Sequence, residues 1–368
     1  MPAWFAISNE HAVPSPAVLL YPDRVEENLR RMIQQAGGAH RLRPHVKTHK
    51  LPQVIAMKLD AGITRFKAAT IAEAEMTAAA GGRDVLLAYQ PVGPNVERFV
   101  ALVQTFPDTR FATLADNLTT VSKLSRAAVA ARITLEIYLD LNVGMNRTGI
   151  APGREAAAIY RAIAAAPGLR AGGLHAYDGH LHDQDHDALV RATRLTFQTV
   201  LDLAALLRDQ GQDVPKIIAS GTPTFPLFAH QPEVEVCCGT TVLWDFGQAQ
   251  ISPDLDFVNA ALQLTRVISR PAPNRLCLDL GHKAVASEMP HPRVRLLGLE
   301  DAVFVMHSEE HLVIETPRAE EFAVGHVLYA IPRHICPTMA LHHDVWAVRD
   351  GQAAERWEVT ARRRQITL

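Results

Sequence analysis

Several features that mark particular classes of protein are scarce in this 368-residue sequence. The formal net charge of -2 leaves no excess of lysine and arginine to meet phosphates, so a general role on nucleic acid or on a membrane surface is not expected. No apolar run approaches the length that crosses a bilayer. No N-terminal segment joins a basic flank to a sustained apolar core, so we also expect no signal peptide.

Cysteine is scarce as well. The four cysteines, at positions 237, 238, 277 and 336, lack the spacing of a disulfide framework, which suits a reducing compartment and a cytoplasmic protein. Cys336 is therefore a candidate metal ligand rather than half of a bridge. With 48% hydrophobic and 21% charged residues, and neither repeats nor low-complexity segments, the composition is that of an ordinary globular enzyme.

Up to about Trp244, short apolar runs alternate with helical patterns. The strand-like runs are Leu42–Lys47, Arg65–Ala69, Val85–Tyr89, Arg110–Leu114, Leu135–Leu141, Gly172–Tyr177, Lys216–Ser220 and Val234–Cys237. The helix candidates between them include Ile71–Ala80, Val96–Thr105, Leu118–Ala131, Arg154–Ala166 and Asp187–Gln210. Eight such units in a row predict an α/β protein with a TIM-like (β/α)8 barrel, which we place at residues 17–245.

After Trp244 the pattern changes to short runs separated by proline, glycine and charged residues. This predicts a mostly antiparallel β domain over residues 246–368, which residues 1–16 are expected to join. A further strand at Ala17–Tyr21 precedes the barrel, and we assign it to the barrel.

Polar residues gather where the predicted barrel strands end, which is where such barrels place their chemistry. His45, Lys47 and His49 lie at the end of the first strand. A lysine amine in a partly desolvated pocket loses pKa and becomes a nucleophile for carbonyl carbons, so Lys47 is a candidate for a Schiff base. A solvated basic turn is the alternative.

The last two barrel strands end in segments that resemble phosphate cradles, in which glycine lets backbone N–H groups approach an anion and hydroxyls add donors. The candidate phosphate ligands are Ser220, Gly221, Thr222, Gly239 and Thr240. A lysine on the first strand with such a cradle on the last two predicts pyridoxal phosphate, whose aldehyde would condense with Lys47.

The motifs then identify a family. Arg43–Lys50 (RPHVKTHK) closely resembles the cofactor-lysine motif of the D-threonine aldolase and D-serine dehydratase group, fold-type III pyridoxal-phosphate enzymes related to alanine racemase. The similarity continues through the segments 140–149, 173–180, 279–285 and 332–338 and covers essentially the whole chain. The resemblance implies a homodimer, a barrel with a second β domain, and a divalent metal beside the cofactor.

The resemblance also implies roles for single residues. It makes Lys47 the cofactor lysine, with Lys50 as the alternative, and Arg147 the cation on the phenolic oxygen of the cofactor. His175 would lie against the cofactor ring, and Tyr177 is a further candidate at the cofactor site. Where alanine racemase has an arginine beside the pyridine nitrogen, this sequence has Cys237.

His334 and Cys336 are the candidate metal pair. If they lie on a strand, both side chains point the same way and can reach one ion. Imidazole with thiolate is a ligand set typical of zinc, and two protein ligands leave positions for water and substrate. Without the resemblance, two unrelated β-domain residues would be the better interpretation; with it, we expect zinc or manganese there, or magnesium.

Two reactions on a β-hydroxy-D-amino acid follow from such a site. Removal of the hydroxyl proton, with His180 or His182 as the base, breaks the Cα–Cβ bond of a D-threonine-type substrate and gives glycine and an aldehyde. Removal of the Cα proton by Lys47, with departure of the hydroxide, gives a 2-oxo acid and ammonia. The motifs favour the aldolase, whereas the thiolate of Cys336 favours the dehydratase.

Two further alternatives remain open at this point. A non-catalytic pyridoxal-phosphate carrier would resemble the barrel alone, and the long segment after Trp244 counts against it. An amino-acid racemase would need a second acid or base on the face opposite Lys47.

Overall fold

The computed structural model describes residues 3–368. Contacts within the chain divide it into two units. The first, which we call the sheet unit, contains the residues up to Leu29, Thr48–Leu51 and Thr240–Arg362, and the second, the barrel unit, contains Arg30–Lys47, Pro52–Gly239 and Arg363–Leu368. The sequence had placed one boundary between residues 245 and 246, and of its predicted segment 1–16, residues 1 and 2 lie outside the described part.

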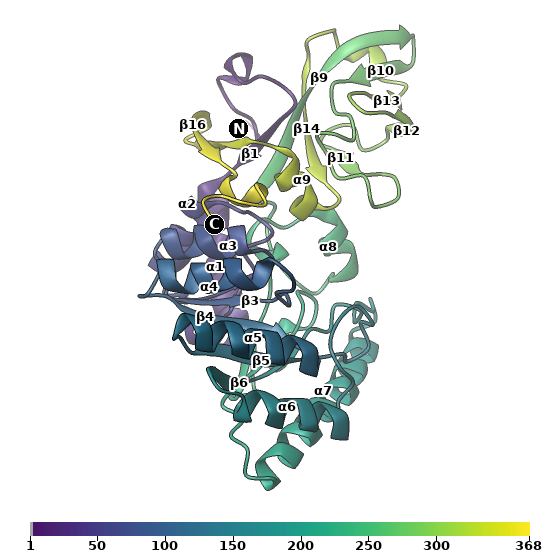
Figure 1. Cartoon of the computed structure of the whole chain (residues 1–368). Helices are drawn as coiled ribbons and strands as arrows, with labels where there is room; N and C mark the ends of the chain where they lie inside the picture. Colours follow the sequence, from purple (N-terminus) through teal and green to yellow (C-terminus); the bar gives the residue numbers. More distant parts are fainter. Residues whose placement is uncertain (1–2) are drawn as a thin grey trace. The chain divides into compact units, whose positions relative to one another are not determined.

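Seven parallel strands form the central sheet of the barrel unit, paired in chain order from β2 to β8 (Figure 1). They are β2 (Arg65–Ala68), β3 (Asp84–Leu87), β4 (Arg110–Ala115), β5 (Leu135–Leu141), β6 (Leu169–Ala176), β7 (Ile217–Ala219) and β8 (Val234–Val236). The helices of this unit are α2 (Pro52–Asp60), α3 (Ile71–Ala79), α4 (Asn95–Thr105), α5 (Leu118–Ala131), α6 (Arg154–Ala165) and α7 (His186–Asp209). α1 (Pro22–Ala36) precedes them.

Residues 42–46 take the place of an eighth strand between β8 and β2. The N–H of Arg43 donates to the carbonyl of Val236 at 2.9 Å, and the N–H of Val46 donates to the carbonyl of Lys67 at 2.9 Å. Both pairings are parallel bridges. The predicted parallel barrel is therefore confirmed, with its first strand shortened to bridges on both sides.

The local signals that predicted the barrel elements are present in the structure. β5 is buried along its whole length, as expected for a parallel strand covered on both faces. α5 has the predicted bounds, and it begins where the side chain of Asn117 accepts a hydrogen bond from the N–H of Thr120. Thr70 caps α3 and Asp185 caps α7 in the same way.

The interior of the barrel is layered along the strands. Glu136, Tyr138 and Asp140 alternate along β5 and therefore share one face of the strand. Tyr138 belongs to an apolar layer that fills the middle of the barrel, together with Leu86, Ala112, Leu114, Ile218 and Cys237. Charged residues lie on one side of this layer and the candidate site lies on the other, so the barrel is a packed core rather than a channel.

A nine-stranded, mostly antiparallel sheet forms the sheet unit, which confirms the predicted β domain. Its main order is β12-β13-β10-β9-β1-β15-β16, and β14 pairs with β9 and β11. The strands are β1 (Ala17–Leu20), β9 (Ala261–Ala272), β10 (Arg275–Leu278), β11 (Val294–Leu296), β12 (Val303–His307), β13 (Leu312–Glu315), β14 (Val327–Pro332), β15 (Asp344–Arg349) and β16 (Gln352–Glu358). Its helices include α8 (Phe246–Ile251) and α9 (Ile335–Leu341).

The strand that the sequence assigned to the start of the barrel, β1, belongs to this sheet instead. Ala17 to Leu20 pair antiparallel with Leu264 to Ala261, and β15 runs parallel on the other side. All four residues of β1 are buried. An apolar run that short satisfies any central position in a sheet, so its composition could not identify its partners.

The four cysteines, all within the described residues, are buried and form no disulfide, as the lack of framework spacing predicted. Among residues 3–368, no helix has the length and hydropathy needed to cross a membrane.

Candidate active site

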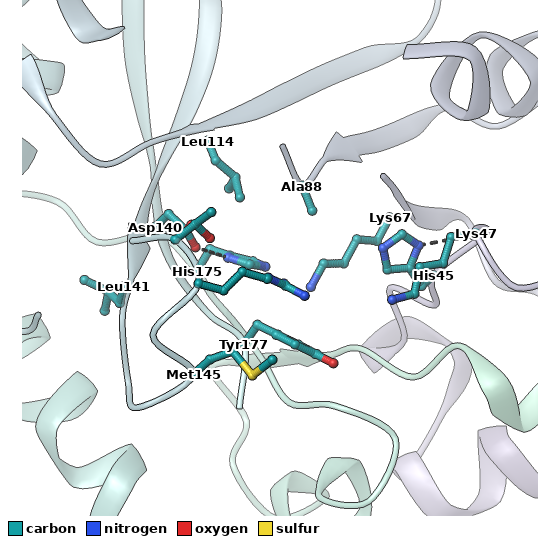
Figure 2. Close-up of a pocket in the computed structure, with 12 residues that line it drawn as sticks. His45, Lys47, Lys67, Ala88, Leu114, Asp140, Leu141, Met145, His175 and Tyr177 are labelled. Carbon is teal, nitrogen blue, oxygen red and sulfur yellow. Dashed lines mark hydrogen bonds and ion pairs between the residues drawn. The ribbon is translucent and has the colours of Figure 1, made fainter. Parts of the chain in front are cut away.

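A pocket in the barrel unit opens where the strands end, and it brings together residues that are far apart in the sequence (Figure 2). Four of the predicted cofactor-site residues line it: Lys47, Arg147, His175 and Tyr177. Three lining residues that the sequence analysis did not nominate carry charge or a hydroxyl: Lys67, Asp140 and Thr148. These four predicted residues therefore share one cavity, whereas the predicted phosphate ligands are not among the residues that line it: Ser220, Gly221, Thr222, Gly239 and Thr240.

Lys47 is partly buried at the end of the segment that closes the barrel. Its backbone N–H donates to Nδ1 of His45 at 3.2 Å, which fixes the turn that carries the side chain into the pocket. Lys50, the alternative cofactor lysine, belongs to the sheet unit and is not among the residues that line the pocket. The geometry therefore favours Lys47 over Lys50.

A bulge in β6 places His175 opposite Asp140. Ile137 pairs with Ala171 but Tyr138 pairs with Gly173, so Gly172 is the extra residue. Gly173 has φ +129°, and a Cβ there would lie 1.9 Å from the carbonyl oxygen of Lys216, so glycine is required. Beyond the bulge the strands are again in register.

The resulting pair fixes the state of the imidazole. Nδ1 of His175 lies 2.7 Å from Oδ1 of Asp140, and the other Asp140 oxygen accepts from the Gln90 amide at 2.8 Å. Burial, followed by the charge of Lys67, lowers the pKa of His175 despite its hydrogen bond to Asp140. A neutral ring that donates from Nδ1 to the carboxylate presents an unprotonated Nε2.

That Nε2 is buried and has no hydrogen-bond partner among the described residues. A buried polar atom without a partner costs free energy unless a ligand or water meets it. The ring of His175, the cation of Arg147 and the amine of Lys47 line the pocket together, and this set fits a planar, anionic aldehyde such as pyridoxal phosphate.

The loop after β5 brings Arg147 over Tyr177. The side chain of Asn142 accepts hydrogen bonds from the N–H groups of Gly144 and Asn146, which curls the loop. The guanidinium carbon of Arg147 then lies 4.9 Å from the centre of the Tyr177 ring. A cation–π contact of this kind holds the guanidinium at the pocket without neutralising its charge.

The predicted phosphate cradle forms an ordered pair of loops. The hydroxyl of Ser220 bonds to the backbone of Cys237, the N–H of Gly221 donates to the Thr224 hydroxyl at 3.1 Å, and the N–H of Gly239 donates to the Thr222 hydroxyl at 3.3 Å. Both N–H groups donate to threonine hydroxyls. These side chains can rotate away, which makes the N–H groups available to an anion.

Asp178, which the sequence analysis did not nominate, lies beside this cradle and is 3% exposed. Burial raises the pKa of its carboxyl to about 6, against the opposing effects of the Thr224 hydroxyl and the Gly221 N–H.

The hydroxyl of Thr240, the residue after Gly239, lies 3.7 Å from the sulfur of Cys336.

The two candidate hydroxyl bases differ in their surroundings. Nδ1 of His180 is buried without a partner among the described residues, and burial lowers its pKa. Its ring lies against Gly144, where a Cβ would come within 2.6 Å of Nε2. His182 is exposed, and neither histidine is among the residues that line the pocket. His180 is therefore the better positioned of the two.

The candidate metal pair lies at the start of a helix, so the strand geometry predicted for it was wrong. His334 precedes α9 and Cys336 is in its first turn. Pro337 suits the first turn of a helix, and the preceding strand, β14, already ends at Pro332. The imidazole and the thiol remain within hydrogen-bond reach of each other, so the pair itself is preserved.

Carboxylates that the sequence analysis did not nominate support this pair. Nδ1 of His334 lies 2.5 Å from a Glu288 oxygen. Although burial alone would lower it, the pKa of His334 is raised to about 9 by Cys336, Asp245 and Glu288. A carboxylate on one ring nitrogen orients the other toward a metal, and imidazole with thiolate suits zinc, so the residues fit a divalent ion.

Within the described residues, no group of three or more His, Cys, Asp and Glu side chains is arranged to hold a metal. Two threonines contact the thiol side of the pair: the Thr48 hydroxyl is 3.2 Å from the sulfur of Cys336, and Thr240 is the other. Thr48 directly follows Lys47 in the sequence.

Two family models match the chain. Residues 21–242 match "Alanine racemase, N-terminal domain", and residues 260–348 match "Putative serine dehydratase domain". The first spans more than half of the chain.

Individual proteins match over nearly the whole length. A D-threonine aldolase of an Arthrobacter species is 29% identical over 95% of this chain and 93% of its own length. A 3-hydroxy-D-aspartate aldolase of Paracoccus denitrificans (strain Pd 1222) is 27% identical over 96% of this chain and 93% of its own length. The crystal structure of D-threonine aldolase from Filomicrobium marinum superposes with a TM-score of 0.90 at 28% identity, covering 98% of each chain.

Proposed function

Because the chain belongs to the family of the alanine racemase N-terminal domain, we propose that it is a pyridoxal-phosphate-dependent lyase acting on β-hydroxy-D-amino acids. Its main reaction is the retro-aldol cleavage of D-threonine-type substrates to glycine and an aldehyde. The observation that carries the proposal is the similarity to aldolases across both units of the chain. The family resemblance expected from the motifs is confirmed.

The pocket of the barrel unit supports the cofactor assignment. Lys47 would hold the aldehyde carbon, Arg147 the phenolic oxygen, and His175 one face of the ring. The hydroxyls and N–H groups around Ser220, Gly221, Thr222, Gly239 and Thr240 would hold the phosphate. When bound, pyridoxal phosphate supplies an electron sink for the bonds of the substrate Cα.

The remaining steps belong to side chains. In the aldol direction a base takes the proton of the β-hydroxyl, and His180 suits this role because its lowered pKa leaves the ring neutral and able to accept. Its neighbour His182 is the alternative base. His334 and Cys336 would hold a divalent ion, zinc or manganese, or magnesium, which supplies Lewis acidity at the hydroxyl oxygen.

A second candidate is the dehydratase that converts 3-hydroxy-D-amino acids such as D-serine into a 2-oxo acid and ammonia. The match of residues 260–348 to a serine dehydratase domain supports it, as does the thiol of Cys336 among the candidate metal ligands. Thiolate ligands suit zinc, which assists departure of hydroxide. In this reaction Lys47 would take the Cα proton.

Two other interpretations receive less support. A non-catalytic carrier would need only the barrel, whereas the chain also matches relatives across its sheet unit. A racemase would need a second acid or base opposite Lys47, and Cys237 stands where alanine racemase has its arginine. A homodimeric assembly and a cytoplasmic location remain predictions from the sequence.

Product analysis tests the proposal. Purified protein, loaded with pyridoxal phosphate and metal, is given D-threonine and D-serine in parallel. We expect glycine and acetaldehyde from D-threonine. Ammonia and a 2-oxo acid as the main products would establish the dehydratase instead, and no product from either substrate with cofactor bound would contradict both.

A further inference from the structure

The pocket contains a second lysine that the family motif does not account for. Lys67 lies on β2 and is 4% exposed, so its amine is buried more deeply than that of Lys47. Figure 2 shows its side chain extending into the pocket, toward His175 and above the ring of Tyr177. Burying a lysine amine inside a barrel costs free energy unless the amine gains a hydrogen-bond or charge partner there.

The groups that face the Lys67 amine are few. It is within hydrogen-bond reach of the Cys237 thiol, and its nitrogen lies 5.4 Å from the centre of the Tyr177 ring. Asp140 attracts its charge and Lys47 repels it. Burial has the largest effect and lowers the pKa of Lys67. The amine therefore keeps N–H groups available and is not tied up in an ion pair of its own.

The position of Cys237 shows which end of the pocket the Lys67 amine occupies. Its side chain belongs to the apolar layer that fills the middle of the barrel, and it is 4% exposed. Because Lys67 reaches that thiol, its amine lies at the closed end of the pocket, against the core. A ligand that enters from the strand ends meets Lys67 last.

We infer that Lys67 is the hydrogen-bond donor to the ring nitrogen of bound pyridoxal phosphate, an inference that rests on the proposed function. In pyridoxal phosphate the ring nitrogen lies across the ring from the aldehyde. A ring whose aldehyde carbon is held by Lys47 turns its nitrogen away from that lysine and into the closed end. The amine of Lys67 is the N–H donor there, since Cys237 offers only a weak thiol.

The consequence is an unprotonated ring nitrogen. An amine that donates a hydrogen bond to that nitrogen occupies its lone pair, and a charged ammonium beside it disfavours a second positive charge. The donor, Lys67, lies on β2. Cys237, which follows β8, stands where alanine racemase has the arginine beside the ring nitrogen, but it is not the donor here. Lys67 is thus a cofactor-positioning residue rather than a second nucleophile.

A pair of cofactors tests this without measuring turnover. Protein freed of cofactor is titrated with pyridoxal phosphate and with its 1-deaza analogue, in which a C–H replaces the ring nitrogen. We expect the wild-type protein to bind pyridoxal phosphate about tenfold more tightly, as one buried hydrogen bond allows. Lys67→Met should bind the two compounds equally, because the donor is gone.

Matched variants keep the test decisive. Lys67→Gln retains an N–H donor and should retain part of the preference, and Lys58→Met removes another fully buried lysine of the barrel unit and should retain all of it. Circular dichroism verifies that each variant is folded. If Lys67→Met folds and keeps the tenfold preference, or if the wild-type protein shows none, the inference is wrong. If the wild-type protein binds neither compound, the proposed pyridoxal-phosphate-dependent function is wrong, whatever the role of Lys67.

Discussion

At the end of the barrel where the strands begin, buried charges form ion pairs, whereas at the end where they finish, two buried imidazole nitrogens have no hydrogen-bond partner within residues 3–368. The guanidinium of Arg43, 1% exposed, lies 2.6 Å from Glu235 and 2.7 Å from Asp84. Glu136 is held between Arg110 and Arg170, at 2.5 Å from each. At the other end, Nε2 of His175 and Nδ1 of His180 have no partner among the described residues.

The difference separates stability from function within one barrel. A buried pair with complete hydrogen bonding rigidifies the structure, and removing one partner exposes the full cost of desolvating the other. Buried groups with shifted pKa values and unsatisfied hydrogen-bonding atoms cluster at sites where a ligand supplies the missing partner. Variants at the paired end should therefore change unfolding, and variants at the open end should change binding and catalysis.

The largest expected effect is on activity at the open end. Lys47→Ala removes the amine that holds the cofactor, so we expect activity to fall by about 10⁶-fold, as loss of the nucleophile does in a serine protease. The visible absorption of the bound cofactor should disappear while the thermal unfolding midpoint changes little. Lys50→Ala is the control. Loss of the absorption in Lys50→Ala, with retention in Lys47→Ala, would reverse the assignment.

Removing the metal tests whether the residues at the strand ends of the barrel are sufficient for activity without it. Prolonged chelation should reduce turnover to background, and zinc or manganese should restore it, because the candidate ligands include an imidazole and a thiol. The cofactor absorption should be unchanged throughout. Activity that survives exhaustive chelation, verified by metal analysis of the protein, would remove the metal from the account.

The paired end should show the largest change in stability. Arg43→Met removes the buried cation that Glu235 and Asp84 share; Glu235 keeps Lys216 at 2.8 Å and Arg65 at 3.1 Å, so we expect the free energy of unfolding to fall by about 3 kcal/mol, the lower end for a broken buried pair. Arg110→Met is a matched control. Its side chain is 45% exposed and Glu136 keeps Arg170, so the loss should be about 1 kcal/mol or less. Equal losses in urea unfolding would show that burial does not separate the two arginines.

The smallest predicted effect is a pH dependence near the cradle. The pKa of Asp178 is about 6 in the folded chain, above its usual value, because the carboxyl is buried. Its contribution to stability is therefore complete below about pH 4 and is lost as the pH rises through 6, by about 2–3 kcal/mol. In urea unfolding, Asp178→Asn should gain on the wild-type protein over this range. If the stability of the wild-type protein and of Asp178→Asn changes in parallel over this pH range, the pKa of Asp178 does not lie near 6.

Much of the fold was predictable because its signals are local. α5 and β5 have the predicted bounds, since apolar periodicity and an N-cap such as Asn117 act within a few residues. The partners of β1 were not predictable, because a four-residue apolar run carries no information about which sheet will bury it. α9 was missed because it has only seven residues and contains Pro337.

The site was predictable where a motif carried it. Lys47, Arg147, His175 and Tyr177 lie on separate segments, and the resemblance rather than periodicity nominated them together. Lys67 had a signal that went unused: a lysine next to Phe66 within a short strand of a parallel barrel, where both faces are buried. The pairing of Asp140 with His175 depends on the β6 bulge, which no local pattern reveals.

The assignment of the cofactor to Lys47 is the claim on which the other proposals depend, and peptide mapping tests it most directly. The loaded protein is reduced with borohydride, which makes a bond between cofactor and lysine permanent, then digested and analysed by mass spectrometry. We predict the pyridoxyl group on Lys47 alone. Its presence on Lys67 would turn the proposed hydrogen-bond donor into the cofactor lysine, and its presence on Lys50 would contradict the site described here.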